Sequence, residues 1–121
     1  MSRCIGTWGE AQVANYLRQK KFHLVAHSYH CRFGEIDLIA MDGNTLCFVE
    51  VKTRSNLAVG LPRDYVTAAK QERIRKTALF YLSEKELDCP VRFDVAGDYR
   101  GTDGGLARIV YMKNAFEVEA N

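Results

Sequence analysis

The stretch from Gly34 to Lys52 constrains this chain most, because two apolar runs rich in β-branched residues flank an Asp-Gly pair. Such a pair predicts a β-hairpin, since a type I′ turn needs positive φ at both central positions and glycine adopts it at little cost. With Asp42 and Gly43 as the turn, Asp37 is predicted to face Phe48. We therefore expect two antiparallel strands at the centre of a sheet.

Four charged residues lie in these otherwise apolar strands. Opposed residues share a sheet face, and so do alternate residues along a strand, which places Glu35, Asp37, Glu50 and Lys52 together. Asp37 and Glu50 are then diagonal neighbours, roughly 7–8 Å apart at the backbone. A shift of the register by one residue would separate them. Burying unpaired carboxylates costs several kcal/mol, and a metal ion would offset that cost.

This set of side chains suits metal-assisted phosphodiester hydrolysis. Mg²⁺ binds oxygen ligands, usually one or two carboxylates together with water and substrate phosphate, and Asp37 and Glu50 could supply them. Lys52 could then position the attacking water or stabilise the charge that grows on the phosphate. The alternative is structural: Lys52 forms a salt bridge with Glu35 or Glu50 on an exposed sheet face.

Glu10 is a candidate third acid. The pattern from Trp8 to Lys20 predicts a helix in which Val13, Ala14 and Leu17 form one face. Glu10 precedes them by three, four and seven residues and shares that apolar face. The helix dipole favours a carboxylate in the first turn, but it does not explain the position on the buried side. Glu10 could therefore bind a metal or a water beside the hairpin.

The acidic pattern resembles that of a known superfamily. Asp37 followed by Glu50-Val51-Lys52 resembles the signature of the restriction-endonuclease-like, or PD-(D/E)XK, nucleases, and Glu10 is similar to the additional acid of archaeal Holliday-junction resolvases. The chain resembles more closely the YraN family, bacterial proteins assigned to this superfamily. The matching segments cover nearly the whole chain in order: Gly9-Glu10, Ala14, Tyr16-Leu17, Gly34–Ala40, Phe48–Arg54, Val66-Thr67, Lys70, Arg92–Val95 and Asn114–Phe116.

The resemblance implies an activity. It implies an endonuclease that uses Mg²⁺ or Mn²⁺ to cut DNA, including branched or otherwise structured DNA, with Asp37, Glu50 and Glu10 as metal ligands and Lys52 as the catalytic lysine. Related resolvases act as dimers, so a homodimer is also expected. Two alternatives stay open: a nucleic-acid-binding protein that keeps the fold without cutting, and a phosphodiesterase that acts on RNA or small nucleotides.

Three basic residues are candidate nucleic-acid contacts. Lys70 shares a predicted helix face with apolar residues, so it either reaches a phosphate or extends past the core to solvent. Arg54 follows the catalytic lysine along its strand. Where the family usually has Asn and Arg before the Gly-Glu-Ile-Asp motif, this chain has Ser28 and His30. Arg32 could replace the missing phosphate contact.

The remaining pattern predicts an α/β fold of order α-β-β-β-α-β-β, a mixed central sheet flanked by helices with a restriction-endonuclease-like core. A helix is expected from Thr67, its N-cap, to Leu82, and strands over Val91–Ala96 and Leu106–Met112. A short turn or helix is expected near Asn114–Phe116. Ile36, Leu38, Cys47, Val49 and Val51 are predicted to fill one sheet face, and Ile39, Leu46 and Phe48 the other.

Composition limits the remaining options. The 121 residues, 47% of them hydrophobic, suffice for one domain, residues 1–121. A net charge of only +2 means that nucleic acid must bind to a local basic patch. Without a long apolar run or a signal-peptide core, a cytoplasmic protein without a membrane span is expected. The four cysteines are expected to be reduced, and a zinc site from His23, His27, His30 and Cys31 is disfavoured because the histidines alternate in direction.

Overall fold

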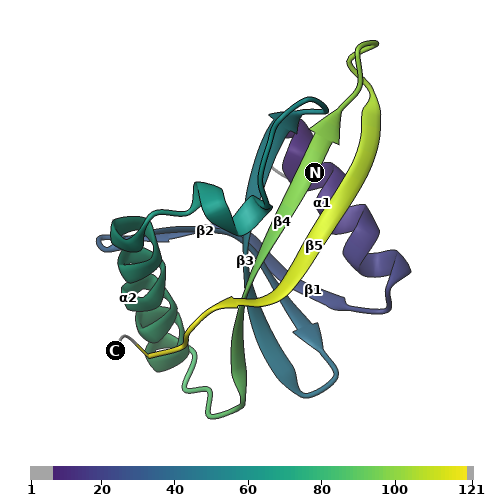
Figure 1. Ribbon diagram of the computed structural model, residues 1–121. Helices are drawn as coiled ribbons and strands as arrows, with labels where there is room; N and C mark the ends of the chain where they lie inside the picture. Colours follow the sequence, from purple (N-terminus) through teal and green to yellow (C-terminus); the bar gives the residue numbers. More distant parts are fainter. Residues whose placement is uncertain (1–6, 120–121) are drawn as a thin grey trace.

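The computed structural model describes residues 7–119 as a sheet with one long helix on each side (Figure 1). Its elements follow one another along the chain as α1 (Trp8–Gln19), β1 (His23–Cys31), β2 (Gly34–Asp42), β3 (Thr45–Ser55), the 3₁₀ helix η1 (Pro62–Tyr65), α2 (Ala68–Glu84), β4 (Val91–Arg100) and β5 (Leu106–Phe116). The predicted α/β class and element order are confirmed.

The sheet has five strands in the order β1-β2-β3-β4-β5. β3 and β4 are parallel, and the other neighbours are antiparallel. Helix α2 makes the crossover between the two parallel strands, as a parallel pair requires. β3, which carries Glu50 and Lys52, is the middle strand and is paired on both sides, so its side chains are held in place by neighbours on both edges.

Helix α1 covers one face of the sheet. Its N-cap is Thr7, whose hydroxyl accepts a hydrogen bond from the Glu10 backbone N–H at 3.1 Å. Val13, Ala14 and Leu17 are fully buried, as the helical pattern predicted, and they pack with strand residues Leu38, Ala40, Cys47, Val49 and Ala96. This packing brings the first turn of α1, with Glu10, close to the strands.

Helix α2 covers the opposite face. Thr67 is its N-cap, as predicted, and the helix ends at Glu84, two residues later than expected. Ile74, Ala78 and Tyr81 pack on Ile39, Leu46, Phe48, Phe93 and Val95. Lys70, in the first turn of α2, reaches β3 at Glu50.

The β2–β3 turn differs from the prediction. Asp42 pairs with Thr45, so the turn residues are Gly43 and Asn44, and Gly43 has φ 61°. Glycine at the first central position is typical of a type II′ turn. Asp42 is held on the strand because its carboxylate accepts from Arg92 Nη1 at 3.0 Å and Lys113 Nζ at 3.4 Å.

The new register moves the partner of Asp37 by two residues. The paired residues run from Asp42–Thr45 to Leu38–Val49, and continuing them by one places Asp37 opposite Glu50 instead of Phe48. A shift of two residues keeps the side of the sheet on which each residue lies. In this register Asp37 comes opposite Glu50 just beyond the last paired residues, and its carboxylate accepts from the Val51 N–H.

One predicted core position was wrong. Ile36 lies on the α2 side with Ile39, not on the α1 side with Leu38. Ser28 and Asp37 lie opposite each other between the pairs His27–Leu38 and Tyr29–Ile36, and Ser28 has φ 51°. This left-handed residue interrupts the regular alternation, and β1 and β2 bend toward the start of α2 (Figure 1).

The C-terminal strand is longer than predicted. Instead of a turn or helix near Asn114–Phe116, β5 continues to Phe116, which stacks on Phe93 with ring centroids 5.0 Å apart. Asn114 has φ 54°, and its N–H donates to Asp94 Oδ1 at 2.9 Å. A bulge fixed by a buried carboxylate allows the strand to pass Asn114 without ending.

Two expectations concern composition. Cys31, Cys47 and Cys89 are free thiols, whereas Cys4 lies outside the described residues. Cys47 is fully buried and packs as a small apolar residue on the face away from Glu50, as predicted. Over residues 7–119 there is no helix of the length and apolarity that a membrane crossing requires.

Candidate active site

Asp37 and Glu50 form a carboxylate pair between β2 and β3. Glu50 is only 6% exposed. Asp37 Oδ2 accepts a hydrogen bond from the Val51 N–H at 2.8 Å. Burial, followed by the negative charges of Glu50 and Glu10, raises the pKa of Asp37 to about 8, although the Val51 N–H acts in the opposite direction. The two carboxylates therefore share a site where negative charge is costly.

Two lysines contact the buried acid. Lys52 Nζ lies 3.5 Å from Glu50 Oε2, and Lys70 Nζ lies 3.6 Å from the same oxygen. Lys52 reaches it from the same strand face, as predicted, and Lys70 from the first turn of α2. Lys52 thus forms the ion pair with Glu50 that the structural alternative predicted, although Glu50 is buried and does not lie on an exposed sheet face.

Glu10 approaches from α1. Its side chain is 9% exposed, and Oε1 has no hydrogen-bond partner within the part of the chain that the structure describes. The negative charge of Glu10 also contributes to the raised pKa of Asp37. Asp37 of β2 is thus influenced by acids from both β3 and α1.

The carboxylates of this site match part of what a divalent cation needs. Across residues 7–119 no three His, Cys, Asp or Glu residues are close enough to hold a metal ion by themselves. Mg²⁺ usually binds one or two carboxylates and keeps several waters, so the Asp37–Glu50 pair matches its needs. The buried, unpartnered oxygen of Glu10 is a further acceptor without compensation. A divalent cation would give this oxygen a partner.

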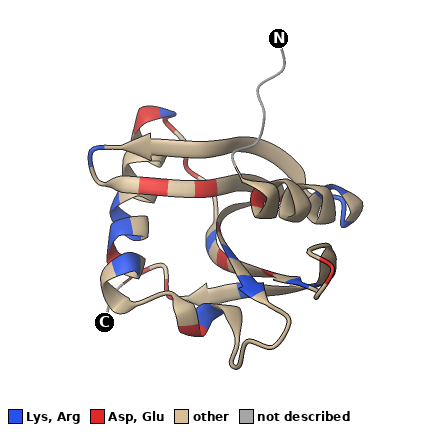
Figure 2. Ribbon diagram, turned by 90° about the horizontal axis from the view of Figure 1, so that it is seen from above, with Lys and Arg blue, Asp and Glu red and all other residues tan. Residues whose placement is uncertain are grey.

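A basic cleft adjoins the acids. It has a volume of about 360 Å³ and is lined by His30, Cys31, Gly34, Glu35, Lys70 and Arg73. Figure 2 shows basic residues on α2 and acidic residues on the neighbouring strands. Arg73 was interpreted from the sequence as part of a solvated face. Its spacing of three residues from Lys70, one helical turn, was the signal for its place in the cleft.

The other predicted contacts lie nearby. Arg32 is exposed in the β1–β2 turn, with its guanidinium 4.8 Å from the ring centroid of Phe33 and 5.9 Å from that of Phe80. Arg54 lies on the same face of β3 as Lys52, 4.3 Å from the ring centroid of Tyr65. Both guanidiniums are stacked on aromatic rings, which orients them while leaving N–H groups for phosphate.

Glu35 stays outside the acidic pair. Its carboxylate lies 3.8 Å from His30 Nδ1 and is 60% exposed. Its predicted partner, Glu50, faces Asp37 because of the two-residue shift in register. Glu35 therefore lines the cleft without joining the carboxylate pair.

Two fully buried carboxylates were not predicted from the sequence. Asp94 accepts from Arg92 Nε at 2.9 Å and from the Tyr111 hydroxyl at 2.5 Å. Asp98 accepts from the Thr53 hydroxyl at 2.8 Å. Because both have hydrogen-bond donors within the sheet, they are structural acids and differ from Glu10. Nothing in the alternation of β4 predicts that these two acids are buried. Their hydrogen-bond donors on other strands explain the burial.

Fold and site together define the class of this protein, a mixed α/β domain with the opposed acids and nearby lysine of the restriction-endonuclease-like arrangement. The chain belongs to the UPF0102 family, because the family model described as "Uncharacterised protein family UPF0102" matches residues 9–97. That range contains every predicted site residue, so the family match covers the whole candidate site.

Relatives match over most of their length. A UPF0102 protein of Geotalea uraniireducens is 43% identical over 97% of this chain and 92% of its own. One from Symbiobacterium thermophilum is 44% identical over 96% of this chain and 98% of its own. One from Nocardia farcinica is 46% identical over 94% of this chain and 90% of its own. These names place the chain in the family and assign no reaction.

Proposed function

We propose that this protein is a metal-dependent endonuclease that hydrolyses phosphodiester bonds in DNA, including branched or otherwise structured DNA. The observation that supports it best is the half-buried Asp37 beside the buried Glu50, with Lys52 at 3.5 Å from Glu50 and the pKa of Asp37 raised by burial and by the neighbouring acids. A carboxyl group with a strongly raised pKa beside a lysine is typical of catalytic sites.

Each acid has a role in this proposal. Asp37 and Glu50 would hold Mg²⁺ or Mn²⁺, and Glu10 would complete the shell or orient a water. When bound, the ion would polarise the phosphate and lower the pKa of a bound water. Asp37 would have to lose its proton to hold the cation, so affinity for the metal would rise with pH. Val51 N–H keeps the Asp37 carboxylate directed toward Glu50.

The lysines act on the substrate. Lys52 donates to the attacking water or to a phosphate oxygen, where negative charge grows during hydrolysis. Lys70 and Arg73 line the cleft and bind neighbouring phosphates. With a net charge of +2, this local concentration of cations supplies the attraction that the molecule as a whole lacks.

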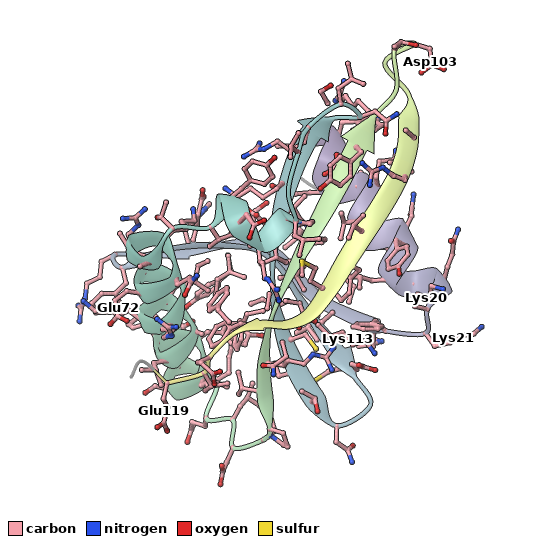
Figure 3. The ribbon with its side chains drawn as sticks, in the orientation of Figure 1. Lys20, Lys21, Glu72, Asp103, Lys113 and Glu119 are labelled. Atoms are coloured by element: carbon pink, nitrogen blue, oxygen red, sulfur yellow. The ribbon has the colours of Figure 1, made fainter. Side chains whose placement is uncertain are left out.

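The test is cleavage of a panel of DNA structures, namely linear duplex, flap, four-way junction and single strand, with Mn²⁺ or Mg²⁺. Asp37→Asn and Lys52→Ala should each reduce cleavage by about 100-fold or more, because each removes a group that acts on the transition state. Asp103→Asn is the matched control, because this exposed acid lies at the tip of the β4–β5 hairpin (Figure 3). The Asp103→Asn protein should cleave DNA as the wild type does.

Other outcomes would lead elsewhere. Equal cleavage by all the variants would mean contamination or a misplaced site. Binding of DNA without cleavage of any structure would favour the non-cleaving nucleic-acid-binding protein. Stronger competition by RNA than by DNA would favour an RNA phosphodiesterase.

A homodimer would let two sites cut two strands symmetrically, and analytical ultracentrifugation with the junction would detect it.

A further inference from the structure

The segment between β3 and η1 exposes aliphatic side chains beside the candidate active site. Leu57 is 84% exposed, Val59 88% and Leu61 42%. They alternate within six residues, so they form one apolar tip, which we call the aliphatic loop, residues 56–61. Clustered exposed apolar side chains typically mark a binding surface, whereas single ones need no explanation.

The aliphatic loop is held by its own hydrogen bonds. Ser55 caps it, since its hydroxyl accepts from the Leu57 N–H at 3.1 Å and its carbonyl from the Ala58 N–H at 2.9 Å. The far end is fixed by Asp64 Oδ2, which accepts from the Leu61 N–H at 2.8 Å. The Tyr65 hydroxyl donates to the Val59 carbonyl. The apolar side chains therefore project from a backbone that is already ordered.

The loop returns to the active site through η1. Lys52 pairs with Gly97 of β4, and a Cβ at Gly97 would lie 2.7 Å from Pro62 Cγ. This close approach seats η1 on the sheet next to Lys52. Glu50 and Ser55 are separated by five residues, so the base of the aliphatic loop lies about 16 Å from Glu50 along the extended strand.

Basic residues connect the two sites. Arg54 follows Lys52 on the same strand face and is fixed over Tyr65. Arg108 Nε donates to Asn56 Oδ1 at 3.2 Å, and Arg63 is exposed within η1. The nearby Asp64 carboxylate accepts from the Leu61 N–H and is outnumbered by these arginines. A polyanion that enters the site at Lys52 would therefore find cations on its way to the aliphatic loop.

An apolar tip next to Arg54, Arg63 and Arg108 is best suited to bind one kind of ligand, nucleic acid. Nucleic acid offers both phosphates for the arginines and base steps between which aliphatic side chains can insert. We propose that the aliphatic loop is a wedge that enters DNA at a discontinuity of the helix, such as a branch point, while the phosphates lie on Lys52 and the arginines. This inference rests on the proposed function and deepens it, because it names branched DNA as the preferred substrate.

The test uses a four-way junction that carries 2-aminopurine at the branch point, and a linear duplex with the same label. Binding is measured with Ca²⁺ in place of Mg²⁺, so that the readout does not depend on cutting. The wild type should raise the fluorescence of the junction, since an unstacked 2-aminopurine is brighter. Leu57→Ser combined with Val59→Ser should remove that rise and weaken junction binding about 10-fold, leaving duplex binding within about two-fold.

The matched control is Leu79→Ser, an aliphatic residue that is 67% exposed on α2. It should bind and brighten the junction as the wild type does. A wild type that fails to bind or brighten the junction, or a double variant that matches it, would overturn the wedge. So would a double variant that loses binding only to phosphatidylglycerol vesicles, because the loop would then serve a membrane.

The wedge and the nuclease can fail separately. If the wild type brightens the junction but cuts no DNA with Mg²⁺ or Mn²⁺, the proposed nuclease fails and the wedge stands. If it cuts junctions and the double variant cuts and brightens them equally well, the wedge fails and the nuclease stands.

Discussion

At the scale of single residues, the buried carboxylates differ in how they are satisfied. Asp94 and Asp98 accept hydrogen bonds from arginine, tyrosine or threonine within the sheet. Asp37 has one backbone donor and two acidic neighbours, and Glu10 has an oxygen with no partner among the described residues. Acids that cost stability are retained where function needs them, so this difference separates the candidate site from the structural network.

Asp37→Asn should therefore stabilise the protein while abolishing activity. The folded state holds a proton on Asp37 from its unfolded pKa of 3.8 up to about 8, so stability falls as the pH rises through this window. Asparagine removes that dependence. We expect the free energy of unfolding to rise by about 1–3 kcal/mol near pH 8, with little change near pH 4.

Urea denaturation at both pH values measures this difference. Asp103→Asn, an exposed acid, should leave stability unchanged at either pH. Mg²⁺ should stabilise the wild type more than Asp37→Asn, because the cation binds only where the carboxylate is present. An Asp37→Asn protein less stable than the wild type near pH 8 would contradict the argument.

Ser28 offers a second test, because it adopts φ 51° opposite Asp37. A residue with a side chain is strained in the left-handed region, and glycine or asparagine tolerates it better. Ser28→Gly should raise the free energy of unfolding by about 0.5–1 kcal/mol. The same substitution at Ser83, exposed within α2, should lower it by about as much, since glycine disfavours helix. Urea denaturation of both variants gives the two changes in the free energy of unfolding. Changes of the same sign would contradict the argument that Ser28 is strained.

At the scale of elements, the position of α1 determines where Glu10 lies. A Cβ at Gly9 would lie 2.3 Å from Thr53 Oγ1 and 2.8 Å from Asp98 Oδ1. Only glycine lets the first turn of α1 approach β3 and β4 this closely. The residue next to Glu10 is thus a packing requirement, and it sets the distance between the helix acid and the strand acids.

Gly9→Ala should destabilise the protein by about 2–4 kcal/mol even though alanine is the better helix former by about 1 kcal/mol. The helix must move outward to admit the methyl group, and Glu10 moves with it. Thermal unfolding followed by circular dichroism measures the loss. Asn15→Ala on the exposed side of α1 is the control and should change stability by less than about 0.5 kcal/mol. A stabilising Gly9→Ala would mean that the close approach is not maintained.

At the scale of the whole molecule, charge is arranged locally. The net charge is +2, yet Lys52, Lys70 and Arg73 gather at the acids, and Arg54 and Arg108 follow β3 and β5 toward the aliphatic loop. DNA affinity should therefore depend on a few phosphate contacts and fall steeply with salt.

Arg54→Ala should reduce the slope of log affinity against log salt concentration by about one for duplex DNA, because one phosphate contact is lost. Arg18→Ala, an exposed arginine at the end of α1, should leave the slope unchanged. Fluorescence anisotropy over a salt series provides both slopes. Equal reductions in the two variants would mean that the protein attracts DNA by its general charge and not along this track.

The sequence determined the elements whose signals are local. Helical periodicity gave α1 and α2 with their buried faces, and the Asp-Gly pair between apolar runs predicted a hairpin whose alternation placed Asp37, Glu50 and Lys52 on one side. Such patterns follow from the repeat of 3.6 residues in a helix and two in a strand, so they can be read from neighbouring residues. The family match over residues 9–97 accords with that local order.

Only the tertiary structure decided the register. Asp42 stays on its strand because Arg92 and Lys113, 50 and 71 residues later, hold its carboxylate, and this moves the turn and brings Asp37 opposite Glu50. β5 passes Asn114 because Asp94 accepts its N–H. These contacts join residues far apart in the sequence, so the periodicity of neighbouring residues cannot predict them. The chain alone specified which residues could form a site, and long-range contacts specified how closely its acids meet.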